Sequence, residues 1–168
     1  MGAGTTVLRV VVGGVFVAHG LQKLGFWGGP GIEGVEKTME SMEMHPAPLQ
    51  ARAVSYAETF GGAALALGVA TPLAGAALIA TMVTAVRKVH LKNGLWNSKG
   101  GYEFNAVLTT AVVAVVADGP GILSVDGIAG KRRGGIGNAL FALGAGVAGS
   151  FAATELARAA APTADSAK

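Results

Sequence analysis

The chain has 168 residues, of which 51% are hydrophobic and only 14% charged, and its mean hydropathy is +0.51. This composition is too apolar for an ordinary soluble domain, so we expect an integral membrane protein whose helices pack through small residues. Cysteine is absent, which excludes a thiolate nucleophile, a disulfide relay and a cysteine-bound metal within this chain. The net charge of +3 fits anionic lipid headgroups better than a nucleic acid, so we expect membrane lipids as partners and no nucleic acid.

Five apolar stretches are long enough to cross a bilayer core, which takes about 20 helical residues. They run over about 5–24, 50–69, 73–91, 102–117 and 135–157. They predict an all-α, polytopic transmembrane helix bundle, with a four-helix core and a fifth, C-terminal transmembrane helix. For the first stretch a cleavable signal peptide is the alternative, but a basic region before it and a small-residue cleavage site after it are missing. Arg9, near the start of this stretch, is expected to snorkel to the interface.

The chain divides into three expected parts. Residues 1–126 form the four-helix membrane bundle, residues 127–158 a basic loop with the extra transmembrane helix, and residues 159–168 a disordered tail. The bundle includes a surface loop at about 25–49, which is longer than a typical connection. In this loop apolar and acidic residues alternate at helical spacing, which predicts a short amphipathic helix on the membrane surface, acting as a lid or spacer.

Polar residues from distant parts of the sequence gather on one side of the membrane, because successive helices cross it in opposite directions. We call this side B and the other side A. The side B residues are His19, Gln22, Lys23, Glu58, Arg87, His90, Asn93, Tyr102, Glu103 and Asn105. Burying each of them alone would be costly, so a shared polar pocket is the economical explanation. Glu58 should pair with Lys23 or Arg87 or take up a proton, although both cations also fit snorkelling anchors.

Several motifs occur in order along the chain: Ala18-His19-Gly20-Leu21-Gln22-Lys23-Leu24, the Phe26–Gly31 loop, Glu58-Thr59-Phe60-Gly61-Gly62, Val89–Trp96, Gly100–Phe104, and Asp118-Gly119-Pro120-Gly121 with Ser124, Val125 and Asp126. Together they resemble the DoxX family of small bacterial and archaeal membrane proteins. The resemblance implies a four-helix membrane bundle over about the first 126 residues, to which the fifth helix is an appendage. One branch of the family resembles the membrane subunit of a thiosulfate:quinone oxidoreductase, and another is linked to membrane complexes that handle oxidative and thiol stress.

The leading functional hypothesis is a membrane subunit of a redox system in a bacterial or archaeal cell membrane, and the sequence leaves open whether this subunit is itself a quinone-linked enzyme. A quinone, or another lipid-soluble molecule, would bind in the side B pocket. Glu58, His19, His90 and Glu103 would carry protons, and Gln22, Lys23, Arg87, Asn93, Tyr102 and Asn105 would bind the substrate. We expect no metal site. The chain has no cysteine and no visible flavin motif, so it has no evident electron source of its own. This implies a redox partner protein that carries a cofactor.

Two other hypotheses stay open. The first is a non-catalytic scaffold or a carrier of lipids or small molecules, for which the glycine-rich fifth helix would support contacts with a partner or a homo-oligomer. The second, and weaker, is a haem protein with His19 and His90 as axial ligands, because these two histidines come from different helices near the same leaflet.

Overall fold

The computed structural model describes residues 3–131 and 134–162 as a bundle of five long helices with short helices at its ends. Arg132 and Arg133 of the expected basic loop, and residues 163–168 of the expected tail, lie outside the described residues. The long helices are α1 (Ala3–Lys23), α3 (Ala47–Leu67), α4 (Thr71–Ala85), α5 (Glu103–Asp118) and α7 (Ile136–Ala159). The shorter α-helices are α2 (Gly31–Ser41) and α6 (Val125–Ile128). Each long helix lies within a few residues of a predicted apolar stretch.

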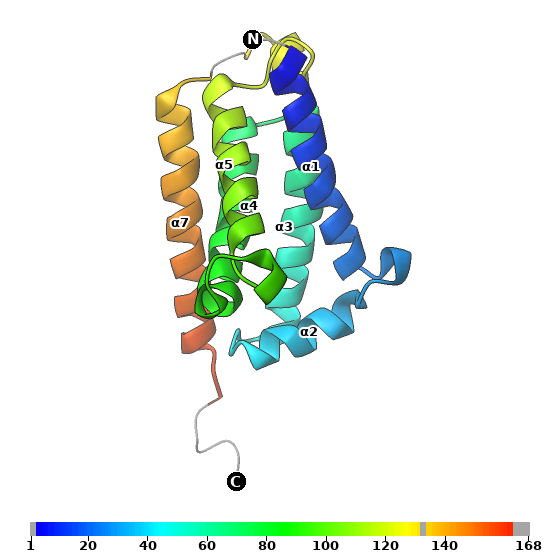
Figure 1. Cartoon of the computed structure of the whole chain (residues 1–168), viewed down its shortest axis with the longest axis vertical. Helices are drawn as coiled ribbons and strands as arrows, with labels where there is room; N and C mark the ends of the chain where they lie inside the picture. The colour runs from blue at the N-terminus through cyan, green and yellow to red at the C-terminus, as the bar shows by residue number, and fades with distance from the viewer. Residues whose placement is uncertain (1–2, 132–133, 163–168) are drawn as a thin grey trace.

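The five long helices alternate in direction, so the N-terminus of α1 and the C-terminus of α7 lie at opposite ends of the bundle (Figure 1). α1 packs against α3, and α4 packs against α7, α3 and α5. The chain leaves α3 through Gly68 and Ala70 in left-handed conformations, and α4 begins at Thr71 with Pro72 in its first turn. This tight connection makes α3 and α4 antiparallel neighbours, as the sequence predicts.

α4 continues without a break into a π-helical turn, Val86–His90, and then a 3-10 turn, Leu91–Asn93. Two more 3-10 turns are Asn97–Lys99, which precedes α5, and Phe26–Gly28, which follows α1. By length and apolar composition, three described helices could cross a membrane: Ala3–Lys23, Thr71–Asn93 and Ile136–Ala159. Among the other long helices, α5 has only 16 residues and α3 contains polar residues such as Arg52 and Glu58. The expectation of an all-α bundle with membrane-spanning helices is confirmed.

Glycines bring α1 and α3 into close contact along much of their length. A Cβ atom built on Gly13 would lie 2.6 Å from the backbone oxygen of Gly62, and one on Gly20 would lie 2.6 Å from the backbone nitrogen of Thr59. Real Cβ atoms do not approach other atoms so closely, so both positions require glycine. Small residues at helix crossings let backbones approach, which is how membrane helices pack tightly.

α7 packs closely against α4 and α5 of the bundle. A Cβ atom on Gly146 would lie 2.6 Å from the Cγ2 atom of Ile79 on α4, so these two helices also pack through a glycine. Gly144, by contrast, faces open space. Ala142 of α7 is fully buried in the central core, which also includes Phe16, Leu65, Leu78, Ile79, Val112, Val115 and Val116.

Arg9 does not snorkel to the interface as the sequence suggested. Only 2% of its surface is exposed. Its guanidinium donates hydrogen bonds to the backbone oxygens of Leu65 (3.4 Å), Ala66 (2.5 Å) and Leu123 (2.8 Å). The carbonyls of the last helical turn have no partners within the helix, so a buried arginine can satisfy them. Arg9 therefore joins α1 to the end of α3 and to the loop before α6.

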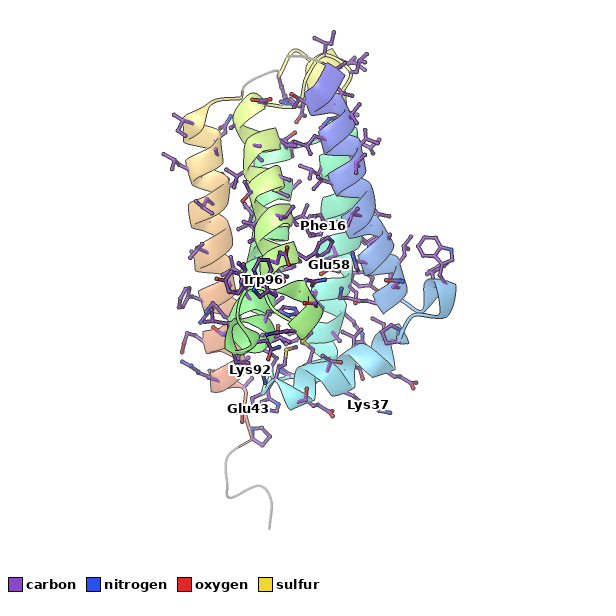
Figure 2. The ribbon with its side chains drawn as sticks, viewed as in Figure 1. Phe16, Lys37, Glu43, Glu58, Lys92 and Trp96 are labelled. Atoms are coloured by element: carbon purple, nitrogen blue, oxygen red, sulfur yellow. The ribbon has the colours of Figure 1, made fainter. Side chains whose placement is uncertain are left out.

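α2 crosses the side B end of the bundle, under α1 and α3 (Figure 1). The predicted amphipathic helix is present, and its buried apolar residues pack on protein. Val35 and Met39 of α2 are buried with Met44, Ala47, Ala51 and Ala157 in a second core cluster. The apolar stripe of α2 thus has a partner in the first turns of α3, while charged residues such as Lys37 and Glu43 lie at the outer end of the molecule (Figure 2).

Candidate functional site

A cavity of about 710 Å³ lies in the side B half of the bundle. All five long helices and α2 contribute to its walls. Most lining residues are apolar, among them Phe16, Val35, Val54, Leu108 and Ala153. Gly149 and Ala153 come from α7, so the fifth helix forms part of the wall. An apolar pocket with a few converging polar groups is the usual form of a small-molecule site.

An ion pair between Lys23 and Glu58 is the main polar feature of the cavity. Nζ of Lys23 on α1 donates to Oε2 of Glu58 on α3. The side chain of Glu58 is 5% exposed and that of Lys23 is 26% exposed. Glu58 lies well inside the bundle, whereas Lys92 lies near its end (Figure 2). Of the two partners that the sequence allowed for Glu58, the structure selects Lys23.

The close packing of α1 and α3 explains why these two side chains meet. Lys23 follows Gly20 by three residues, so both lie on the same face of α1, and Glu58 precedes Thr59, the residue that Gly20 contacts. The helix backbones therefore approach closely about one turn from the ion pair. Gly20 and Thr59 hold the polar end of the cavity in place, although neither residue lines it.

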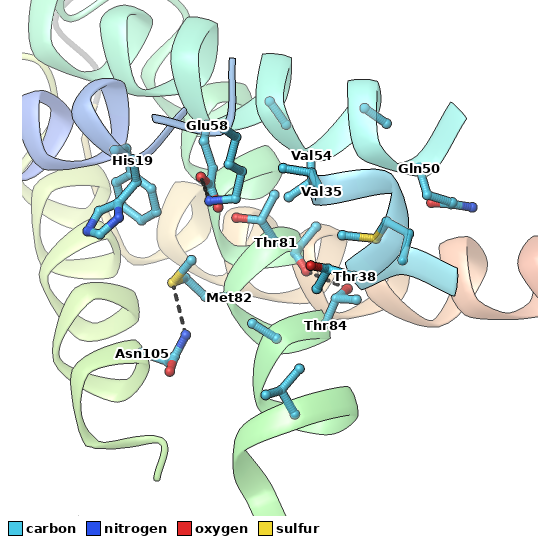
Figure 3. Close-up of a pocket in the computed structure, with 18 of the residues that line it drawn as sticks. His19, Val35, Thr38, Gln50, Val54, Glu58, Thr81, Met82, Thr84 and Asn105 are labelled. Carbon is cyan, nitrogen blue, oxygen red and sulfur yellow. Dashed lines mark hydrogen bonds and ion pairs between the residues drawn. The ribbon is translucent and has the colours of Figure 1, made fainter. Parts of the chain in front are cut away.

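His19, His90 and Asn105 also line the cavity, from α1, the π-helical turn and α5. His19 is exposed, and its ring lies 6.1 Å from that of Phe104. Nδ1 of His90 lies 2.7 Å from the backbone oxygen of Gly100. Asn105 is 7% exposed and donates to the thioether sulfur of Met82 at 3.4 Å. His19 and Glu58 stand at one end of the cavity, with Gln50 at the other (Figure 3).

The structure thus brings six of the ten predicted site residues to one cavity: His19, Gln22, Lys23, Glu58, His90 and Asn105. Arg87 lies outside it, because it turns toward α7. Its guanidinium donates to the hydroxyls of Ser150 (3.0 Å) and Thr154 (3.4 Å) and lies 3.6 Å from the centre of the Phe151 ring. This cation–π contact attaches α7 to the end of α4.

The other three predicted site residues also lie outside the cavity. The carboxylate of Glu103 accepts from the backbone N–H of Asn97 at 3.0 Å, and the amide of Asn93 donates to the backbone oxygen of Gly100 at 3.1 Å. Both side chains hold the loop between α4 and α5. Tyr102 lines a separate hollow of about 320 Å³, which shares Asn105 with the main cavity.

Residues of α2 and of the segments on either side of it also line the cavity, which the sequence did not predict. Pro30, Thr38, Met39, Met42 and Met44 all line it. The backbone oxygen of Met42 accepts a hydrogen bond from Nζ of Lys88 at 3.0 Å, so a cation of the π-helical turn holds the end of α2. The amphipathic pattern of this segment was a signal for a helix, but it did not show which surface the helix covers.

In the described part of the chain no group of three or more histidines, aspartates and glutamates is placed to hold a metal ion. Apolar helices that could cross a membrane, together with an internal pocket that holds a charge pair, define a multi-pass helical membrane protein. The sequence model of the DoxX family matches residues 4–91, just over half of the chain, and the protein therefore belongs to the DoxX family.

The chain is also similar to a protein of Bacillus subtilis (strain 168) named "Putative oxidoreductase CatD". The two are 28% identical over 136 residues, which cover 79% of this chain and 93% of that protein. The solved structures contain no significant match.

Proposed function

We propose that the chain is the membrane subunit of a redox system in the cell membrane and that it binds a quinone in the cavity. The observation that carries this proposal is an apolar cavity of about 710 Å³ that holds the Lys23–Glu58 pair. A lipid-soluble ring with polar oxygens matches such a site, since apolar walls take the body of a ligand and a few polar groups orient it. The name of the Bacillus subtilis relative, an oxidoreductase, supports a redox role.

The polar groups around the cavity suit a reaction that takes up protons. Reduction of a quinone to its quinol consumes two electrons and two protons. Nδ1 of His90 faces a carbonyl oxygen, which only accepts hydrogen bonds, so this nitrogen carries a hydrogen and leaves Nε2 available for proton exchange. His19, which is exposed, is in a position to pass protons between the cavity and its surroundings.

Asn105 and Lys23 supply hydrogen-bond donors for a quinone oxygen. The amide of Asn105 donates to a thioether sulfur, a weak acceptor, which a ligand carbonyl oxygen would replace. Lys23 would stabilise negative charge that develops on the same oxygen, while Glu58 holds the lysine in place. The electrons would come from a partner protein with a bound redox cofactor, or from a second small molecule, because the chain contains no cysteine.

The proposal is tested by purifying the protein in a mild detergent and identifying the copurifying lipids by mass spectrometry. The test variants are Glu58→Gln and His90→Ala, both in the cavity wall. Glu103→Gln is the matched control, because it makes the same chemical change outside the cavity. We expect a quinone with the wild type and with the control, and its loss from the two cavity variants.

The other hypotheses give different results in the same preparation. Only bulk phospholipid in every sample would contradict quinone binding and favour the scaffold or lipid carrier. A Soret absorption band in protein made with adequate haem, lost on replacement of His19 or His90, would instead favour the haem hypothesis.

A further inference from the structure

The methionines of this chain have an unusual distribution. The sequence contains five, and the four that follow Met1 all line the cavity: Met39, Met42, Met44 and Met82. Leu108 is the one leucine among the described lining residues. Leucine is equally apolar and similar in volume, so hydrophobicity alone does not explain why thioether side chains surround this cavity.

Three of the four methionines belong to one segment, α2 and the turn after it. Met39 is 9% exposed and Met44 is 2% exposed, and both pack against small or branched neighbours such as Val35 and Ala51. Met42 is partly buried against the same cluster. A methionine side chain is unbranched, with three rotatable bonds and a polarizable sulfur, so it adapts to differently shaped neighbours at little cost.

The part of the cavity around the Lys23–Glu58 pair is rigid, in contrast to the methionine wall. The Lys23–Glu58 pair stands next to the close contact between Gly20 and Thr59, where neither helix has room to shift. The cavity therefore combines a fixed polar end with an adaptable apolar wall. A wall of this kind accommodates ligands that share a polar head but differ in the shape of their apolar part.

We infer that Met39, Met42 and Met44 determine the ligand range of the cavity, which accepts quinones with ring systems of different width at similar affinity. This inference rests on the proposed function, because it concerns ligands of the same site. The polar head is held by fixed groups in every case, while the three side chains change rotamer to fit a one-ring, two-ring or three-ring body. The sulfur atoms also make favourable contacts with aromatic ring edges.

The experiment compares the dissociation constants of a benzoquinone, a naphthoquinone and an anthraquinone that carry the same decyl tail, measured in detergent micelles. We expect the wild type to bind all three within about tenfold of one another. The variant Met39→Leu, Met42→Leu, Met44→Leu keeps side-chain volume nearly constant but replaces flexible chains by branched, stiffer ones. We expect the three dissociation constants of this variant to differ by about a hundredfold or more, because its stiffer wall binds the ring system that fits it and binds the other two weakly.

A second sample separates flexibility from sulfur chemistry. Biosynthetic replacement of methionine by norleucine removes the sulfur but keeps the unbranched chain, so we expect the narrow spread of the wild type. A triple leucine variant with the same spread as the wild type would overturn the inference and leave quinone binding intact. A norleucine protein as selective as the leucine variant would also overturn it. If the wild type binds none of the three quinones, the proposed function itself fails.

Discussion

Removing the lysine of the Lys23–Glu58 pair should destabilise the protein more than neutralising the glutamate. The Glu58 side chain is 5% exposed, so Lys23→Met leaves a buried carboxylate without its cation. Loss of one member of a fully buried pair costs about 3–5 kcal/mol. Because Lys23 itself is 26% exposed, we expect the lower end of that range, about 3 kcal/mol. Glu58→Gln leaves a lysine that is in part exposed and still has an amide oxygen to bind, so we expect about 1 kcal/mol.

The assay is equilibrium unfolding in mixed micelles with increasing dodecyl sulfate, followed by circular dichroism. The double variant Lys23→Met, Glu58→Gln removes both charges, and we expect it to be more stable than Lys23→Met alone. The double-mutant cycle should then give a coupling free energy of about 2 kcal/mol. Lys92→Met, which removes an exposed lysine, is the control and should change stability by less than about 0.5 kcal/mol.

Equal losses below about 0.5 kcal/mol for both single variants would refute the reasoning. That result is typical of an ion pair that water screens. It would mean that the polar end of the cavity is hydrated and that Glu58 needs no cation for stability.

Three further predictions concern the contacts around the cavity, and each is measured by the same unfolding assay unless stated. Gly20→Ala should cost about 1–3 kcal/mol, because its Cβ atom would collide with α3. Gly14→Ala, which faces open space on the same helix, should change stability little. Arg9→Met should cost at least about 2 kcal/mol, because carbonyls of α3 and of the loop before α6 lose a charged donor, and unchanged stability would contradict that role. Phe151→Leu removes the cation–π contact with Arg87, worth about 1 kcal/mol, and should speed hydrogen exchange at the end of α7; unchanged exchange would show that α7 is held by other contacts.

The positions of the long helices could be predicted because each apolar stretch is close to the length that a bilayer requires. Successive membrane-spanning helices cross the bilayer in opposite directions, and this alternation alone places His19, Lys23, Glu58 and His90 in the same half of the bundle. For this reason the sequence also predicted the Lys23–Glu58 pair as one of three options, beside a pair with Arg87 and a protonated Glu58.

The rotation of each helix about its axis could not be predicted in the same way. Arg87 and His90 were both expected in the side B pocket, and residues three apart share a face of a regular α-helix. Both lie in a π-helical turn, which has more residues per turn, so this spacing no longer brings them together. His90 lines the cavity, whereas Arg87 contacts α7.

The role of Arg9 was missed for a related reason. An arginine near the end of an apolar stretch normally extends to the headgroups. Here the left-handed residue Gly68 ends α3 beside it, and a Cβ atom at Gly68 would lie 2.7 Å from Nη1 of Arg9. The backbone carbonyls at that helix end accept hydrogen bonds from the buried arginine. No periodic pattern in the sequence predicts which carbonyls are free to do so.

The separation between the fixed and adaptable parts of the cavity affects how such a protein can change over evolutionary time. A Cβ atom at position 20 would collide with Thr59, so most substitutions of Gly20 would disturb the helix contact beside the Lys23–Glu58 pair. Three of the methionines in the cavity wall come from a single short segment around α2, which packs in a core cluster that contains neither Lys23 nor Glu58. Mutations in that segment can therefore change the shape of the cavity wall while the Lys23–Glu58 pair is inherited unchanged.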